Sequence, residues 1–197
     1  MAGEFTPRQR AIYEVVLGGQ LKAIESTKPG IMYKDVHIAV ARAMALGLKE
    51  IGLMKGDIDE AVAAGAHALF FPHGIGHMLG LDVHDMEGLG ENFVGYNKTV
   101  ERSKQFGLAY LRMARELRPG FVLTVEPGVY FIPALIDKWR AEKKHTAFIN
   151  YVKVEAYRNF GGIRIEDDVL VTANGCRVLG RPIPKTVKDI EKTMAKK

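Results

Sequence analysis

The chain has 197 residues, of which 47% are hydrophobic and 26% are charged. This composition is typical of one globular domain with its own core, and it excludes a disordered chain, a collagen and a coiled coil. The formal net charge is +5, but residues 181–197 alone hold six basic and two acidic side chains, a net +4. Because the excess lies in a lysine-rich tail and not in a basic stripe mixed with aromatic side chains, we expect no nucleic-acid partner.

The sequence also predicts no contact with a membrane. No apolar run reaches the roughly 18 residues that a membrane-spanning helix needs. The segment 1–7 has no basic stretch followed by an apolar one, so we expect no leader and a cytoplasmic location, or the location of a longer parent chain. The single cysteine, Cys176, can form no internal disulfide, and it is predicted to be an ordinary thiol beside a turn.

The first fifty residues are predicted to form two helices. Thr6 is expected to cap the first helix, with Pro7 at its first position and Gln9 completing a capping box. That helix should stop at 28–30, where Lys-Pro-Gly follows the apolar stripe. Apolar residues at helical spacing predict a second helix over 36–52.

Apolar spacing, glycines and prolines also predict the elements of the remaining chain. Glycines and a proline over 70–77 indicate an extended strand or a loop. The other predicted elements are a short helix over 59–69, a fourth helix over 106–117, a strand over 121–125, a polar stretch over 137–159 with one short helix, and a strand over 163–171.

Three histidines near the middle of the chain are candidates for one site. His73 and His77 would share a face on a helix, as in a zinc-peptidase motif, but the glycines between them argue against a helix. In an extended segment the two rings start about 13 Å apart, at roughly 3.3 Å per residue, so we do not expect them to hold one metal together. The pattern favours one metal ligand and one neighbour that orients a ligand or substrate, with His84 as a third candidate for the same cavity.

The carboxylates further along the chain allow two interpretations. Glu126 ends an apolar strand, where an ionised group needs a cation, a metal or hydrogen-bond donors. Arg164, Glu166 and Asp168 alternate on one face of the last strand, which fits either the solvated face of a half-buried sheet or a metal site. Imidazole combined with carboxylates suits Mn, Zn, Co or Fe(II), and so indicates a metal hydrolase.

Four motifs together resemble one family. The chain resembles the pita-bread metallopeptidases, and within them the Xaa-Pro dipeptidases (prolidases) and their aminopeptidase P relatives, over residues 3–187, through the motifs at 73–77, 80–85, 125–131 and 162–168. The resemblance implies an α+β fold, with a curved antiparallel sheet, helices on its outer face and the site in its concavity. It also implies that residues 1–197 are a single truncated catalytic domain, the C-terminal part, without the N-terminal domain or the first strands.

The resemblance further implies a dinuclear site of manganese, cobalt or zinc that hydrolyses the bond before proline. The metal ligands that it implies are His77, Glu126 and the bridging Glu166. The implied catalytic residues are His73 and His84, which contact the substrate and stabilise the tetrahedral intermediate, a role suited to hydrogen-bond donors. Arg164 matches an arginine beside the bridging carboxylate, and Arg112 matches the arginine that holds the C-terminal carboxylate of a dipeptide. A solvated Arg112 on a helix surface is an equally good interpretation of the sequence alone.

The chain departs from the family pattern at two metal ligands. The family has two aspartate ligands before the segment that resembles residues 3–7, and Asp35, Asp57 and Asp59 match neither. We therefore expect at most one metal in this chain alone.

Three hypotheses remain. The parent protein hydrolyses proline-containing peptides, or the chain is a non-catalytic peptide-binding module, or it is one half of a split enzyme. A homodimer or a complementing chain is the expected partner, because unpaired sheet edges bind other chains. His37, His67 and His145 match no family position, and we expect them on helix surfaces or loops.

Overall fold

The computed structural model describes residues 3–195. Met1 and Ala2 of the segment 1–7, and Lys196 and Lys197 of the basic tail, lie outside the described residues. The α-helices are Pro7–Ser26 (α1), Tyr33–Glu50 (α2), Ile58–Ala63 (α3), Glu91–Val94 (α4), Pro133–Ala141 (α5), Tyr151–Glu155 (α6) and Val187–Met194 (α7). The strands are Val122–Val125 (β1), Gly128–Phe131 (β2), Gly161–Arg164 (β3), Asp167–Val171 (β4) and Cys176–Val178 (β5), and short 3-10 turns cover Ala66–Leu69 (η1), Glu87–Leu89 (η2) and Leu108–Tyr110 (η3).

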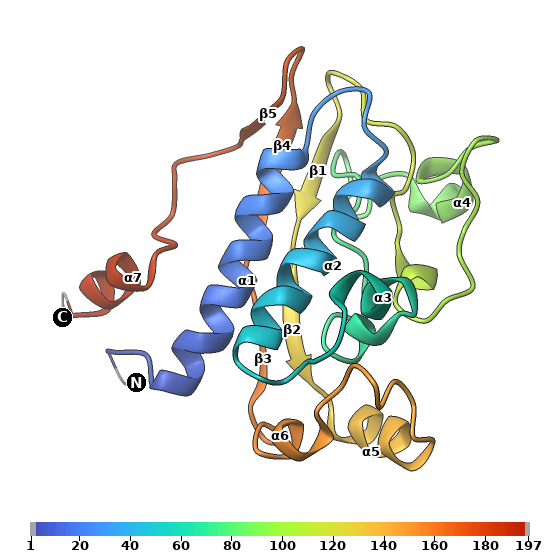
Figure 1. Ribbon diagram of the computed structural model, residues 1–197. Helices are drawn as coiled ribbons and strands as arrows, with labels where there is room; N and C mark the ends of the chain where they lie inside the picture. Colours follow the sequence, from blue (N-terminus) through green and yellow to red (C-terminus); the bar gives the residue numbers. More distant parts are fainter. Residues whose placement is uncertain (1–2, 196–197) are drawn as a thin grey trace.

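The N-terminal helices confirm their predicted signals. The Thr6 hydroxyl accepts the backbone N–H of Gln9, and the Gln9 side chain accepts the backbone N–H of Thr6, so the capping box is complete. α1 and α2 lie side by side across one face of the strands (Figure 1). No helix among residues 3–195 has both the length and the apolar character to cross a bilayer.

The prediction of a fourth helix over 106–117 is wrong. Only the turn η3 forms there, and the chain then continues as an irregular extended segment. The backbone N–H groups of Ala114 and Leu117 donate to Gly95 and Ile31, which lie far away in sequence, and not to residues four positions earlier. Leu111 and Met113 are buried on either side of the half-buried Arg112, the alternation of an extended chain. The apolar spacing of this segment serves contacts with two distant segments and not one helix face.

Other boundaries also differ from the predictions. Gly65, at φ +83°, separates the predicted third helix into α3 and η1. The polar stretch holds two helices, α5 and α6, where one was expected. The predicted strand over 163–171 is divided at Ile165 and Glu166, and β2, β5 and α7 were not predicted.

The strands form two small antiparallel sheets that follow one another along the same pair of chain segments. β1 pairs with β4 and β4 with β5, while β2 pairs with β3. The ladder is interrupted between β1 and β2 at Glu126–Pro127, and between β3 and β4 at Ile165–Glu166. Both interruptions therefore contain a glutamate of the predicted site.

The glycine-rich segment after Phe71 adds a further row beside β1. Backbone hydrogen bonds join Thr124 N–H to His77 O, Glu126 N–H to Ile75 O and Leu79 N–H to Val122 O. A Cβ on Gly76 would lie 2.0 Å from the carbonyl oxygen of Thr124, so only glycine allows this approach. The extended conformation predicted for 70–77 is confirmed.

Two histidines that were expected at the surface are part of the core. His37 on α2 is 0% exposed and His67 in η1 is 2% exposed. The His37 ring lies 5.0 Å from that of Phe71 and 6.3 Å from that of His67. The expectation was wrong because each imidazole lies on an apolar face of its element, where packing and not polarity decides its place.

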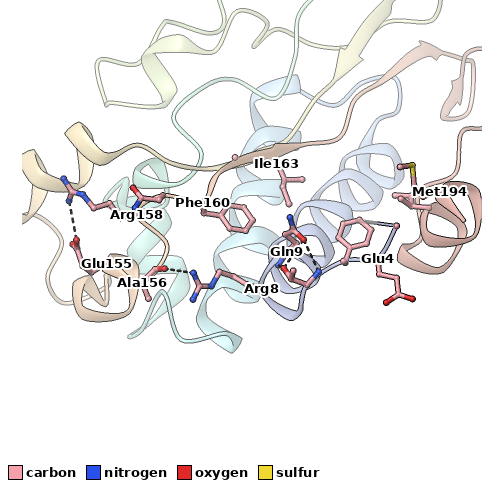
Figure 2. Close-up of a pocket in the computed structure, with 15 residues that line it drawn as sticks. Glu4, Arg8, Gln9, Glu155, Ala156, Arg158, Phe160, Ile163 and Met194 are labelled. Carbon is pink, nitrogen blue, oxygen red and sulfur yellow. Dashed lines mark hydrogen bonds and ion pairs between the residues drawn. The ribbon is translucent and has the colours of Figure 1, made fainter. Parts of the chain in front are cut away.

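The C-terminal arm, residues 179–195, leaves β5 and passes outside α1 to α7 (Figure 1). Lys185 joins the arm to the rest of the chain through two contacts. Nζ of Lys185 lies 2.8 Å from Oδ1 of the buried Asp167, and the carbonyl of Lys185 accepts a hydrogen bond from the Tyr13 hydroxyl. A cavity of about 690 Å³ lies between the N-terminal segment, α6, β3 and α7, with Phe160 and Ile163 on its wall (Figure 2).

Candidate functional site

All seven residues predicted for the site line one cavity of about 430 Å³. The cavity is separate from the larger one in Figure 2, and its walls come from the 73–84 segment, the extended 110–112 segment and the two strand interruptions. Its lining residues are His73, Gly74, Gly76, His77, Val83, His84, Tyr110, Arg112, Glu126, Arg164 and Glu166.

His77 and Glu126 are the closest potential ligands. Nε2 of His77 lies 3.3 Å from Oε1 of Glu126, and both side chains are largely buried. Nδ1 of His77 lies 2.9 Å from the carbonyl oxygen of Met78, which fits a tautomer with the proton on Nδ1 and the Nε2 lone pair facing the carboxylate. Two ligands each about 2.1 Å from one zinc ion lie roughly 3 to 3.5 Å apart, so this pair has the spacing of a metal site.

Thr124 holds the two groups in this arrangement. Its hydroxyl oxygen accepts the backbone N–H of His77 at 3.0 Å, and the hydroxyl donates to Oε1 of Glu126 at 3.1 Å. The carbonyl of Thr124 in turn accepts the hydroxyl of the buried Tyr33 at 2.6 Å. The hydrogen bond between Thr124 and Glu126 shows that the two side chains lie on one face of this segment.

Arg164 joins the two glutamates. Its Nη1 lies 3.4 Å from Oε2 of Glu126, and its Nε lies 3.6 Å from Oε2 of Glu166. Burial raises the pKa of the Glu166 carboxyl, and the neighbouring Glu126 carboxylate adds to this rise. Among residues 3–195, no group of three His, Cys, Asp or Glu side chains is close enough to hold a metal, because Glu166 turns to the guanidinium.

His73 also lines the cavity. Its Nδ1 lies 2.7 Å from the carbonyl oxygen of Gly74, and its Nε2 lies 3.1 Å from the hydroxyl of Tyr130. Burial is the main cause that lowers the pKa of His73. Burial also raises the pKa of the Tyr130 hydroxyl, so this hydroxyl stays protonated at neutral pH.

His84 and Arg112 complete the rim. The rings of His77 and His84 meet edge to face, with centroids 4.4 Å apart. Arg112 comes from the extended segment and not from the expected helix, and its side chain is 37% exposed. Its Nη1 contacts the Glu87 carboxylate and lies 3.3 Å from Oε1 of Glu91.

Sequence reasoning missed Tyr130 and Glu87 as members of this site. Tyr130 lies four residues after Glu126 on β2, a strand that was not predicted, so its alternation with Gly128 carried the only signal. Glu87 lies in a loop without periodicity, and only the folded chain brings it to Arg112.

Comparison with known proteins identifies relatives of the chain. Residues 1–173 match the model of metallopeptidase family M24. The Xaa-Pro dipeptidase of Rattus norvegicus is 45% identical over 193 residues, and the human one is 43% identical; each match covers 98% of this chain and 38% of the relative. A probable Xaa-Pro aminopeptidase of Botryotinia fuckeliana is 37% identical over 190 residues, which cover 96% of this chain and 39% of the relative.

Solved structures give the same fold. Pseudomonas aeruginosa aminopeptidase PepP superposes with a TM-score of 0.70 at 38% identity, and zinc-substituted Escherichia coli aminopeptidase P in complex with product with 0.72 at 35%. Each match covers 98% of this chain and 36% of the other. The chain thus spans about 38% of the length of the curated relatives that it matches. The expected pita-bread fold is confirmed, and this chain belongs to the metallopeptidase family M24.

Proposed function

We propose that this chain carries the histidine and glutamate part of the active site of a metal-dependent peptidase that cleaves Xaa-Pro peptides. The observation that supports this most strongly is the convergence of His73, His77, His84, Glu126 and Glu166, with two arginines, on one cavity. The relatives named Xaa-Pro dipeptidase and aminopeptidase P make proline-containing peptides the substrate class to test.

The donor set fits a divalent metal. His77 and Glu126 have the spacing of two ligands on one ion, and Glu166 would join them by turning away from Arg164. Manganese, cobalt and zinc all accept imidazole and carboxylate ligands. A metal held there would polarise the peptide carbonyl and make water a better nucleophile.

The other cavity residues are proposed to hold the peptide. His84 would donate a hydrogen bond to the carbonyl oxygen as negative charge develops on it, and His73 would do so with the Nδ1 proton that the Gly74 carbonyl now accepts. Tyr130, which lies at Nε2 of His73, would orient the ring. Arg112 would bind a carboxylate at the far end of the proline residue. In this proposal, Arg164 neutralises the two glutamates until a metal enters.

A metal titration tests the proposed ligands. We expect weak binding of at most one Mn(II) per chain by calorimetry, loss of binding in Glu166→Ala, and no turnover of an Xaa-Pro dipeptide. Glu142→Ala, a change of the same charge at an exposed position on the end of α5, should bind as the wild type does. Failure of the wild type to bind any divalent metal would contradict the assignment of His77, Glu126 and Glu166.

The edge of β3 favours completion of the site by another segment. Within residues 3–195 the strand paired with β3 is β2, and Gly162 and Ile163 of β3 line the cavity of about 690 Å³ beside Phe160 (Figure 2). An extended segment could add to this edge by strand pairing and bring the two aspartates that the resemblance implies. We propose a complementing segment, or a second copy of the chain, as its occupant.

Association and activity can be measured together. We expect sedimentation to detect self-association of the chain, or association with an added polypeptide that carries the two aspartates. In the second case Mn(II) should restore Xaa-Pro cleavage. A completed protein that binds metal normally yet cleaves no Xaa-Pro peptide would contradict the catalytic function and favour a peptide-binding module.

A further inference from the structure

The positive charge of Arg112 is already paired with protein carboxylates. Both Glu87 and Glu91 contact its Nη1, Glu87 more closely. Glu91 also lies 2.7 Å from Nη2 of Arg102, which takes part of its charge. Glu87 is therefore the nearer of the two carboxylates that pair with Arg112, and Glu91 divides its charge between Arg112 and Arg102.

Glu87 is a fixed group and not a loose surface acid. Its side chain is 13% exposed, although it comes from a loop. Its backbone N–H donates to the carbonyl of His84, and its Oε2 lies 3.7 Å from Nδ1 of the same histidine. One carboxylate thus faces both Arg112 and His84 on the same wall of the cavity.

This pairing changes what Arg112 can recognise. A ligand carboxylate that approaches a free guanidinium gains a full ion pair, whereas one that approaches Arg112 must share or displace Glu87. A ligand whose proline continues into an uncharged amide does not compete with Glu87. An unpaired arginine would strongly favour a ligand with a free terminal carboxylate over one with an amide. Because Arg112 is paired with Glu87, this preference is expected to be weaker in the cavity.

We propose that Glu87 is a specificity-determining residue that directs this site toward peptides that continue past the proline, and away from Xaa-Pro dipeptides. This inference rests on the proposed function, because it requires that Arg112 faces the proline end of a bound peptide. It deepens that function by naming peptides longer than two residues as the preferred substrate class.

Binding of two small probes to the chain tests the inference. Gly-Pro carries a carboxylate on proline, and Gly-Pro-amide is its neutral counterpart. We expect NMR titrations to give no tighter binding of Gly-Pro than of Gly-Pro-amide by the wild type. Glu87→Gln should tighten Gly-Pro binding by about fivefold, the upper end for a solvated ion pair, because the Arg112 side chain is 37% exposed, and should leave Gly-Pro-amide unchanged.

Matched variants separate this effect from a general charge effect. Glu142→Gln removes the same charge from an exposed position and should leave both affinities unchanged. The double variant Arg112→Gln/Glu87→Gln should lose the gain for Gly-Pro. Glu87→Ala provides the same test if Glu87→Gln alters the NMR spectrum of the free chain.

The outcomes distinguish two failures. If the wild type prefers Gly-Pro severalfold, or if Glu87→Gln tightens both probes equally, the role of Glu87 is overturned while peptide binding stands. If no variant binds either probe, the proposed function of this cavity fails, and the inference falls with it.

Discussion

The hydroxyl of Thr124 makes two hydrogen bonds on one face of β1. It accepts from the backbone of His77 and donates to the carboxylate of Glu126, so it sets the separation of the two residues that we propose as metal ligands. Both hydrogen bonds are largely shielded from water, which makes the loss of either one costly.

Thr124→Val should therefore destabilise the protein. The variant keeps the shape of the side chain but leaves the buried N–H of His77 without an acceptor. We expect the free energy of unfolding in urea to fall by about 1 to 3 kcal/mol. Thr146→Val, at an exposed loop position, is the control and should change it by less than about 0.5 kcal/mol. Equal losses in the two variants would contradict the role of Thr124.

At the scale of elements, α1 and α2 pack closely because small residues line their contact. A Cβ on Gly19 would lie 2.7 Å from Cγ of Met44, while a Cβ on the neighbouring Gly18 would meet nothing within 4 Å. Gly47 on α2 makes a similar approach to Val15. These contacts set the position of both helices over the strands.

The adjacent glycines of α1 form a matched pair. Gly18→Ala should raise the free energy of unfolding by about 0.5 to 1 kcal/mol, since alanine favours the helix and the space is open. Gly19→Ala should lower it by about 1 to 3 kcal/mol, because Met44 must move within a packed core. Thermal and urea unfolding of both variants would check this, and stabilisation of the same size in both would contradict close packing.

A partly buried ion pair between Lys185 and Asp167 joins the C-terminal arm to β4. Lys185→Ala would leave Asp167, which is 8% exposed, with only the amide of Gln20 as a partner. We expect a loss of about 2 kcal/mol in urea unfolding, less than for a fully buried pair because Lys185 is partly solvated. Lys188→Ala on the exposed side of α7 is the control, and a similar loss there would show that the arm needs charge and not this pair.

For the whole molecule, the two core histidines make stability depend on pH. Burial lowers the pKa of His37 to about 3 and that of His67 to about 4, from an ordinary value of 6.5. In both cases desolvation is the main cause, and both rings are neutral in the folded chain at pH 7. Below pH 6.5 the unfolded chain therefore binds protons that the folded chain does not.

These two histidines should not reduce the free energy of unfolding above pH 7. The free energy of unfolding should fall as the pH decreases from 6.5 toward 4. The limiting slope is about 1.4 kcal/mol per pH unit for each histidine. His37→Gln should remove one such contribution from the slope in urea unfolding at pH 7, 6 and 5. His145→Gln, at a half-exposed loop position, should remove less. An unchanged slope in His37→Gln would rule out His37 as a source of the pH dependence.

The sequence predicted local features well where the signal was itself local. The capping box of Thr6 and Gln9, the extended glycine-rich segment and the strand that ends just before Glu126 all depend on neighbouring residues. The supposed helix over 106–117 failed because the backbone N–H groups of Ala114 and Leu117 donate to the carbonyls of Gly95 and Ile31, which lie in distant segments.

The sequence by itself determined the family, the fold and the residues that meet in the cavity, because the four motifs keep their residue types and order along the chain. Only the tertiary structure decided which groups pair within the cavity. Arg164 lies between Glu126 and Glu166, Tyr130 beside His73, and Glu87 beside Arg112. It also decided that His37 and His67 are buried. The physical reason is that ion pairs and burial depend on distances between segments far apart in sequence, and no local pattern encodes those distances.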